Sequence, residues 1–105
     1  MAHDPHYARD SIGDIAPKLA ELTDAVLFAD VWARAEISPR ERSIATVSAL
    51  IALNRGEQLP FHLARARDNG LSEAELVELI THLAFYAGWP CAFSAIGTLR
   101  KERAP

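Results

Sequence analysis

Two capping boxes constrain the fold most, because each marks the start of an α-helix: SPRE at residues 38–41 and SEAE at residues 72–75. In this motif the serine hydroxyl accepts a hydrogen bond from the backbone N–H three residues later, and the glutamate accepts one from the serine N–H. Apolar residues follow each box at spacings of three and four, which is typical of a helix with one buried face. We therefore expect helices over about 39–54 and 73–87.

Glycine and proline indicate where the other helices begin and end. Gly70 follows an apolar helical pattern over about 57–69, and glycine commonly ends a helix in the left-handed conformation. Pro90 suits the first turn of a last helix, because its missing N–H has no helical partner there. Residues 14–33 also have a helical composition, and Thr23 is expected to cap a second helix within this segment.

The composition agrees with an all-α fold of five or six helices. The chain of 105 residues contains 19 Ala and 12 Leu but only 4 Val, so strong helix formers outnumber β-branched residues. A chain this short buries only part of its surface, so we expect it to form a homo-oligomer. The polar residues 1–10 are expected to be a tail, either disordered or ordered on a neighbouring subunit, before a single domain over 11–105.

Charge and cysteine content exclude several classes of function. The net charge is −3, so the chain has no cationic excess with which to bind nucleic acid. No apolar run approaches the roughly 18 residues that span a bilayer, so no membrane association is expected. A single cysteine excludes an internal disulfide, and the polar start lacks the apolar core of a secretion signal. These features favour a cytoplasmic protein.

Two histidines are the first candidates for chemistry, because His62 and His82 lie on the apolar stripes of consecutive predicted helices. Only residues 70 and 71 connect these two helices. A connection this short favours an antiparallel hairpin of neighbouring helices. At 1.5 Å per residue the two imidazoles would differ in height by roughly 5 Å and would open onto one cavity. The alternative is that each is a buried histidine satisfied by a neighbour. Arg65 and Arg67 are expected on the outer face.

A glutamate and three arginines gather around the first capping box. Glu41 is the third residue of that helix, where capping alone explains it, although the positive helix end would also hold an ionised acid or base there. Arg34, Arg40 and Arg42 would form a solvated charge network with nearby glutamates, or a clamp for an anion, since the guanidinium fork matches carboxylates.

Cys91 is expected in the first turn of the last helix. That position can lower the pKa of a thiol and make it reactive, but a small buried apolar residue is the plainer interpretation. A metal site made from His62, His82, Cys91 and Glu41 lacks any local ligand motif, so no metal is expected.

Four motifs together resemble one family. They are DVWAR at 30–34, PRERS at 39–43, FHL with DNGLS over 61–72, and HLAFYAGWP at 82–90. The chain from about 15 to 101 is similar to the carboxymuconolactone decarboxylase family, which also includes alkylhydroperoxidases of the AhpD type. The resemblance implies an AhpD-like all-helical fold, assembled as a homotrimer or homohexamer, with active sites near subunit contacts.

The resemblance also separates two chemistries. The peroxidase branch carries a CxxC pair shortly before the histidine that His62 resembles, and those positions here are Arg55 and Gln58. Both thiols are missing, so a disulfide-linked peroxidase is not expected. The decarboxylase branch needs no cofactor: it binds a lactone with two carboxylates, stabilises the oxyanion that CO₂ loss creates, and protonates a ring carbon.

By resemblance, His62 transfers the proton and Glu41 orients it or relays protons. Arg34 and Arg42 bind the substrate carboxylate or the oxyanion. The remaining candidates for contact with a small anionic substrate are Trp32, His82, Tyr86 and Cys91.

Two alternatives stay open from the sequence. In the first, the chain is a non-catalytic, accessory helical oligomer of the same family in which His62 and His82 are structural. In the second, it is a redox protein that uses the thiol of Cys91 alone.

Overall fold

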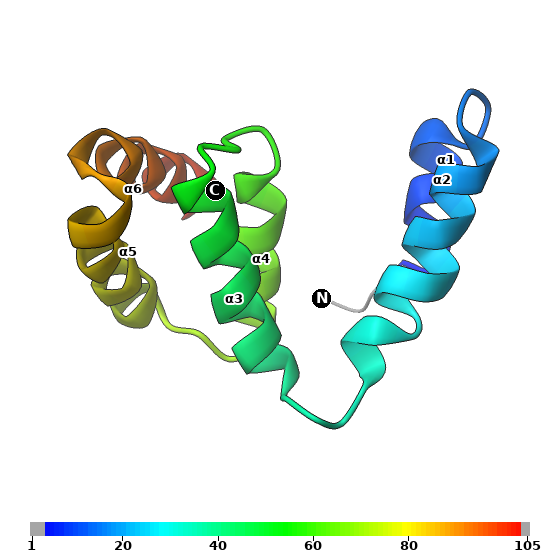
Figure 1. Ribbon diagram of the computed structural model, residues 1–105, viewed down its shortest axis with the longest axis horizontal. Coiled ribbons are helices and arrows are strands. Elements are labelled where there is room, and N and C mark those ends of the chain that lie inside the picture. The colour runs from blue at the N-terminus through cyan, green and yellow to red at the C-terminus, as the bar shows by residue number, and fades with distance from the viewer. Residues whose placement is uncertain (1–3, 104–105) are drawn as a thin grey trace. The chain divides into compact units, whose positions relative to one another are not determined.

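The computed structural model describes residues 4–103, and every regular element in that range is a helix (Figure 1). The prediction of an all-α fold is therefore confirmed. The chain forms two compact units, residues 1–39 and 40–105. No helix within the described range is both long enough and apolar enough to cross a membrane. The single domain expected over 11–105 stays a prediction.

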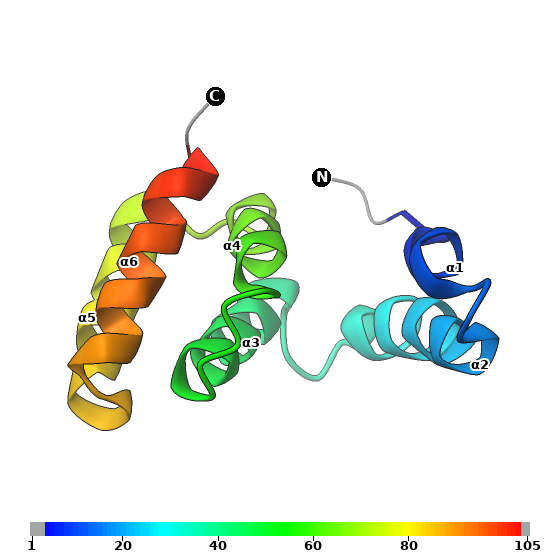
Figure 2. The ribbon, with the colours of Figure 1, turned by 90° about the horizontal axis from the view of Figure 1, so that it is seen from above.

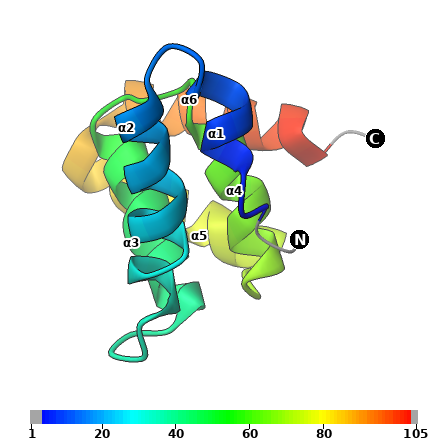
Figure 3. The same cartoon turned by 90° about the vertical axis from the view of Figure 1, so that its right-hand side faces the viewer.

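The first unit consists of short helices in close succession. In chain order these are α1 (Tyr7–Ile12), α2 (Pro17–Glu21), the π-helix η1 (Leu22–Phe28) and the 3-10 turn η2 (Val31–Ala33). Helices α1 and α2 pack side by side (Figure 3). Asp24 of η1 is hydrogen-bonded to α1. Its two carboxylate oxygens accept hydrogen bonds from the N–H groups of Ala8 and Arg9, at 2.9 Å each.

One expectation for this unit was wrong, and one stays a prediction in part. The segment expected to be a polar tail forms α1 from Tyr7 onward and buries Ala8, so it is not disordered there; its ordering on a neighbouring subunit stays a prediction, and residues 1–3 lie outside the described range. Thr23 does not cap a new helix, because it lies inside η1 and its hydroxyl donates to the carbonyl of Leu19 at 2.7 Å. The break occurs instead as a change from α to π geometry at Leu22.

The second unit contains the four longer helices: α3 (Pro39–Ala52), α4 (Leu59–Asp68), α5 (Glu73–Ala87) and α6 (Trp89–Arg103). The starts of α3 and α5 agree with the two predicted capping boxes. In the second box the Ser72 hydroxyl accepts from the Glu75 N–H at 3.1 Å, and the Glu75 carboxylate accepts from the Ser72 N–H at 3.0 Å.

The helices of this unit end where left-handed residues occur. Asn54, Gly70 and Gly88 have φ angles of 58°, 102° and 105°. At Gly70 the N–H groups of residues 70 and 71 donate to the carbonyls of Arg67 and Ala66, both at 3.0 Å. This pattern is the Schellman motif, and it confirms the predicted end of the helix before it.

The core lies in the second unit and joins side chains of all four helices. Its largest fully buried side chains are those of Val47, Leu63, Leu76 and Ile80. Helix α5 packs along α6, and α4 also packs against α6 (Figure 2). The expectation that α4 and α5 form an antiparallel hairpin was therefore wrong, because a short connection permits several crossing angles and both helices pack against α6 instead.

Polar contacts hold the ends of these helices together. Arg40 of α3 binds Glu75 of α5 through its guanidinium. Arg67 of α4 lies 2.5 Å from a carboxylate oxygen of Glu102 and 3.7 Å from one of Glu73. Arg67 was expected on an outer face, but its side chain is only 27% exposed, because its two partners come from α5 and α6.

Candidate functional site

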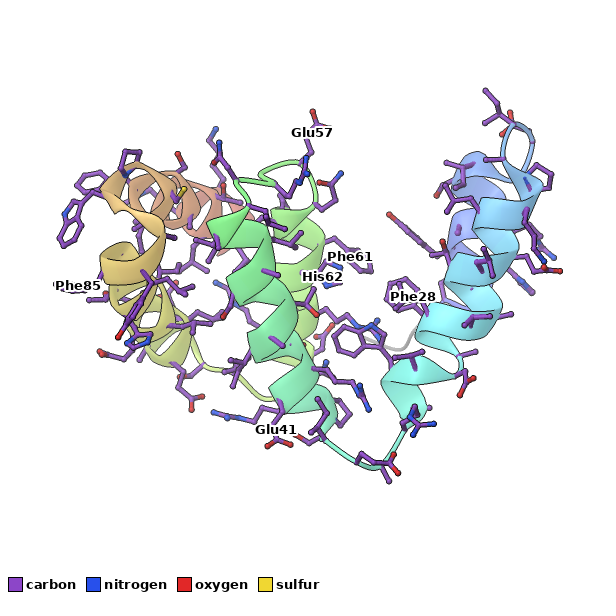
Figure 4. The ribbon with its side chains drawn as sticks, viewed as in Figure 1. Phe28, Glu41, Glu57, Phe61, His62 and Phe85 are labelled. Atoms are coloured by element: carbon purple, nitrogen blue, oxygen red, sulfur yellow. The ribbon has the colours of Figure 1, made fainter. Side chains whose placement is uncertain are left out.

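His62 lies in the first turns of α4 and is half-buried. The helix begins at Leu59, and Pro60 occupies the position where a missing N–H is tolerated. The imidazole stands edge-on to the ring of Phe61, with 5.0 Å between ring centroids and 85° between planes (Figure 4). The backbone of α4 and this aromatic contact together set the position of the imidazole.

The surroundings of His62 disfavour its charged form. Burial is the larger cause and the positive charge of Arg65 the smaller, and together they lower the pKa of His62 to about 4. The imidazole is therefore neutral at pH 7 and can accept a proton. A bound anion would reverse part of this effect, because an opposite charge within a few ångströms favours the protonated form.

Arg65, like Arg67, does not lie on the outer face where the sequence placed it. It is half-buried and acts electrostatically on His62. Residues three apart on a helix share a face, and Arg65 follows His62 by three residues. This spacing could have predicted that Arg65 lies beside His62. The pair gives α4 one face that carries a neutral imidazole and a permanent cation.

At the start of α3 one of the predicted arginines forms an ion pair, as the charge-network interpretation expects. Arg40 binds Glu75, so that guanidinium already has a carboxylate partner within the protein. Arg42 is half-buried and Glu41 is exposed in the first turn. In Figure 4 the side chains of Glu41 and His62 do not point toward each other.

The first unit holds two further candidates. Trp32 of η2 is buried, and its ring lies 6.3 Å from that of Phe28, measured between centroids. Arg34 follows η2 in an extended conformation and is exposed, with a guanidinium nitrogen 3.5 Å from a carboxylate oxygen of Glu36.

His82 and Tyr86 lie together on α5 rather than beside His62. Both are exposed, and their rings are 5.0 Å apart between centroids. His62 projects from α4 on the side away from α5 (Figure 4). The shared cavity expected for the two histidines is therefore not formed in this chain, because α5 pairs with α6 instead.

Cys91 is half-buried in the first turn of α6. It lines a small hollow of about 20 Å³ together with Asn54 and Arg55 of the α3–α4 connection, Leu59 of α4 and other residues of α3 and α6. This volume is close to that of one water, so the hollow is too small for an organic substrate. Among the described residues, no three His, Cys, Asp or Glu side chains gather as metal ligands would.

Comparison with known proteins gives the family. The model of the carboxymuconolactone decarboxylase family matches residues 17–101. The chain is 31% identical over 87 residues to a 4-carboxymuconolactone decarboxylase of Acinetobacter baylyi, covering 83% of this chain and 65% of that protein. It is 30% identical over 81 residues to the nitrosuccinic acid decarboxylase npaB of Metarhizium robertsii, covering 77% and 57%. The chain thus spans less than two thirds of both relatives, and it belongs to the carboxymuconolactone decarboxylase family.

Proposed function

We propose that this protein is a decarboxylase that acts without a cofactor on a small anionic lactone or a related enolisable acid, such as 4-carboxymuconolactone. The observation that carries the proposal is the neutral, half-buried imidazole of His62 beside the cation of Arg65. The names of the two relatives, both decarboxylases, support the same reaction class.

The proposed reaction has two steps. The C–C bond to the carboxylate breaks, CO₂ leaves, and the electron pair moves through the ring double bond onto the lactone oxygen. Cationic side chains stabilise that oxyanion, and we assign this work to Arg42 and Arg34. His62 then delivers a proton to the ring carbon: the oxyanion re-forms the carbonyl, and the electron pair of the enolate double bond forms the new C–H bond.

Substrate binding would let His62 take up from solvent the proton that it delivers. The free imidazole is neutral at pH 7, because burial and Arg65 hold its pKa near 4. A carboxylate beside it raises the pKa, so substrate and proton bind together. We assign Glu41, exposed at the start of α3, to proton exchange between solvent and the site. We further propose that the enzyme works as a homotrimer or homohexamer.

The test is an ultraviolet assay in which 4-carboxymuconolactone is generated in situ and its loss is followed. We expect the wild-type protein to accelerate the loss and His62→Gln to abolish the acceleration. His6→Gln is the matched control, because His6 is an exposed histidine in the first unit. A second arm offers nitrosuccinic acid. Activity on neither compound, or full activity of His62→Gln, would contradict the proposal.

A further inference from the structure

Four polar residues form a row along α4, which we call the polar row. They are Gln58, His62, Arg65 and Asn69. Their spacings are four, three and four residues, and at 3.6 residues per turn these spacings place them in one line along the helix. The first and the last are the residues that flank α4, and all except Gln58 are half-buried. The row therefore runs the length of the helix and is partly shielded from solvent.

Arg65 gives the polar row its permanent charge. Burial lowers the pKa of its guanidinium, and the negative charge of Asp68 offsets part of this effect. Asp68 itself is exposed, three residues further along the helix. A guanidinium has five N–H donors, which is more than one carboxylate uses. Arg65 can therefore bind a second carboxylate, at a half-buried position where salt screens the attraction less than it does on the surface.

Arg65 and His62 are close enough to act on one small molecule. At 1.5 Å per residue their Cα atoms differ in height by roughly 4.5 Å along the helix. The charge of Arg65 acts on the imidazole of His62, which confirms that the two side chains are near each other. His62 projects from α4 on the side away from α5 (Figure 4). A ring whose carboxylate-bearing arm lies on Arg65 would thus present a ring carbon to His62.

Asn69 connects the polar row to α3. Its side-chain amide donates to the hydroxyl of Ser43 at 3.0 Å, and Ser43 is fully buried. Ser43 directly follows Arg42, the residue assigned above to the oxyanion, and Arg65 lies one helical turn before Asn69. The hydrogen bond therefore holds the turn of α3 that carries Arg42 close to the turns of α4 that carry Arg65.

Two neighbouring arginines are already engaged within the protein. The guanidinium of Arg40 binds Glu75, and that of Arg67 lies 2.5 Å from a carboxylate oxygen of Glu102. Arg67 follows Arg65 by two residues, a spacing that places it on another side of the helix. Arg65 is thus the arginine of α4 that lies on the face of His62.

We propose that Arg65 binds the carboxylate that the substrate retains, and that it thereby selects acids with a second carboxylate on an arm of the ring. The proposal rests on the proposed decarboxylation, in which the other carboxylate leaves as CO₂. A guanidinium can hold a carboxylate through two parallel hydrogen bonds, which fix orientation as well as position. Binding at Arg65 would therefore set which ring carbon faces His62.

Two unreactive compounds test the proposal on the full chain. 2-Furylacetate has an oxygen-containing ring with a carboxymethyl arm and no carboxylate on the ring to lose, and 2-furylacetamide is its neutral counterpart. By titration calorimetry we expect the wild-type protein to bind the acid at least about tenfold more tightly than the amide. NMR should show the ring protons of His62 shifting when the acid binds. Arg65→Gln should lose the preference, and Arg65→Lys should keep part of it, because lysine retains the charge without the planar fork.

Arg55→Gln is the matched control, because Arg55 is an exposed arginine of the same unit, and it should keep the full preference. Circular dichroism should show unchanged helicity in each variant. A wild-type protein that binds both compounds equally, or binds neither, would overturn the proposal, as would an undiminished preference in Arg65→Gln. Neither compound can undergo the proposed decarboxylation, so the result does not depend on turnover. Arg65-dependent binding by a protein that decarboxylates nothing would support this site and contradict only the proposed reaction.

Discussion

At the scale of single residues, His62 and Arg65 show how one helix face can tune an acid–base group. Partial burial of the imidazole and a cation three residues away disfavour a second positive charge, so the pKa of His62 is lower than usual. The sequence predicted the position of His62 on an inward stripe. The sequence did not predict the protonation state of His62. The pKa of His62 depends on burial and on Arg65, which was expected on another face of the helix.

Replacing Arg65 should raise the pKa of His62. In Arg65→Gln the nearby cation is gone, but burial, the larger cause of the shift, remains. We therefore expect the pKa to rise from about 4 but to stay below its ordinary value of 6.5, as followed by NMR titration of the ring protons. Arg55→Gln is the control, and an unchanged His62 titration in Arg65→Gln would contradict this electrostatic assignment.

The same pKa makes stability depend on pH. Between about pH 6.5 and 4 the unfolded chain binds a proton at His62 that the folded chain does not, so stability is full above this window and falls as the pH drops through it. The side chain is partly exposed, so solvent screening leaves an effect of about 1 kcal/mol, or roughly 4 °C in Tm. Thermal unfolding of wild type and His62→Gln should show a smaller loss for the variant; parallel curves would refute this account.

At the scale of elements, the sequence predicted where several helices begin and end, but it did not predict which helices pack against each other. The second capping box and the end at Gly70 rest on local hydrogen bonds, which the sequence encodes over a few residues. The change to π geometry at Leu22 has no such local marker. The pairing of α5 with α6 is a contact between whole helices, which no short motif specifies.

Asp24 offers a test of how α1 is held. Its carboxylate accepts from two backbone N–H groups, and the amide of Asp24→Asn has only one oxygen to offer. We expect the variant to lose about 1 kcal/mol of stability and to exchange the amide hydrogens of Ala8 and Arg9 faster. Asp14→Asn is the control, because Asp14 is also an exposed residue of this unit. Unchanged exchange at both amides would exclude the anchoring role.

At the scale of the whole molecule, the family follows from motifs spread over most of the chain, and the match to residues 17–101 confirms the resemblance read from them. The individual candidate residues divide into separate groups. His62 lies with Arg65 on α4, His82 lies with Tyr86 on α5, and Cys91 lines a small hollow. The sequence predicted the family because each motif is a short local pattern. It did not predict which candidate side chains lie close together, because that depends on how the helices pack.

Initial rates of CO₂ release from 4-carboxymuconolactone test whether His62 transfers the proton in the decarboxylation. General acid catalysis contributes about 10²–10⁴-fold, so we predict that His62→Gln lowers kcat/KM by at least about 100-fold, while His6→Gln stays within about twofold of wild type. Release of CO₂ by His62→Gln at the wild-type rate would contradict the account, as would a wild-type protein that releases none.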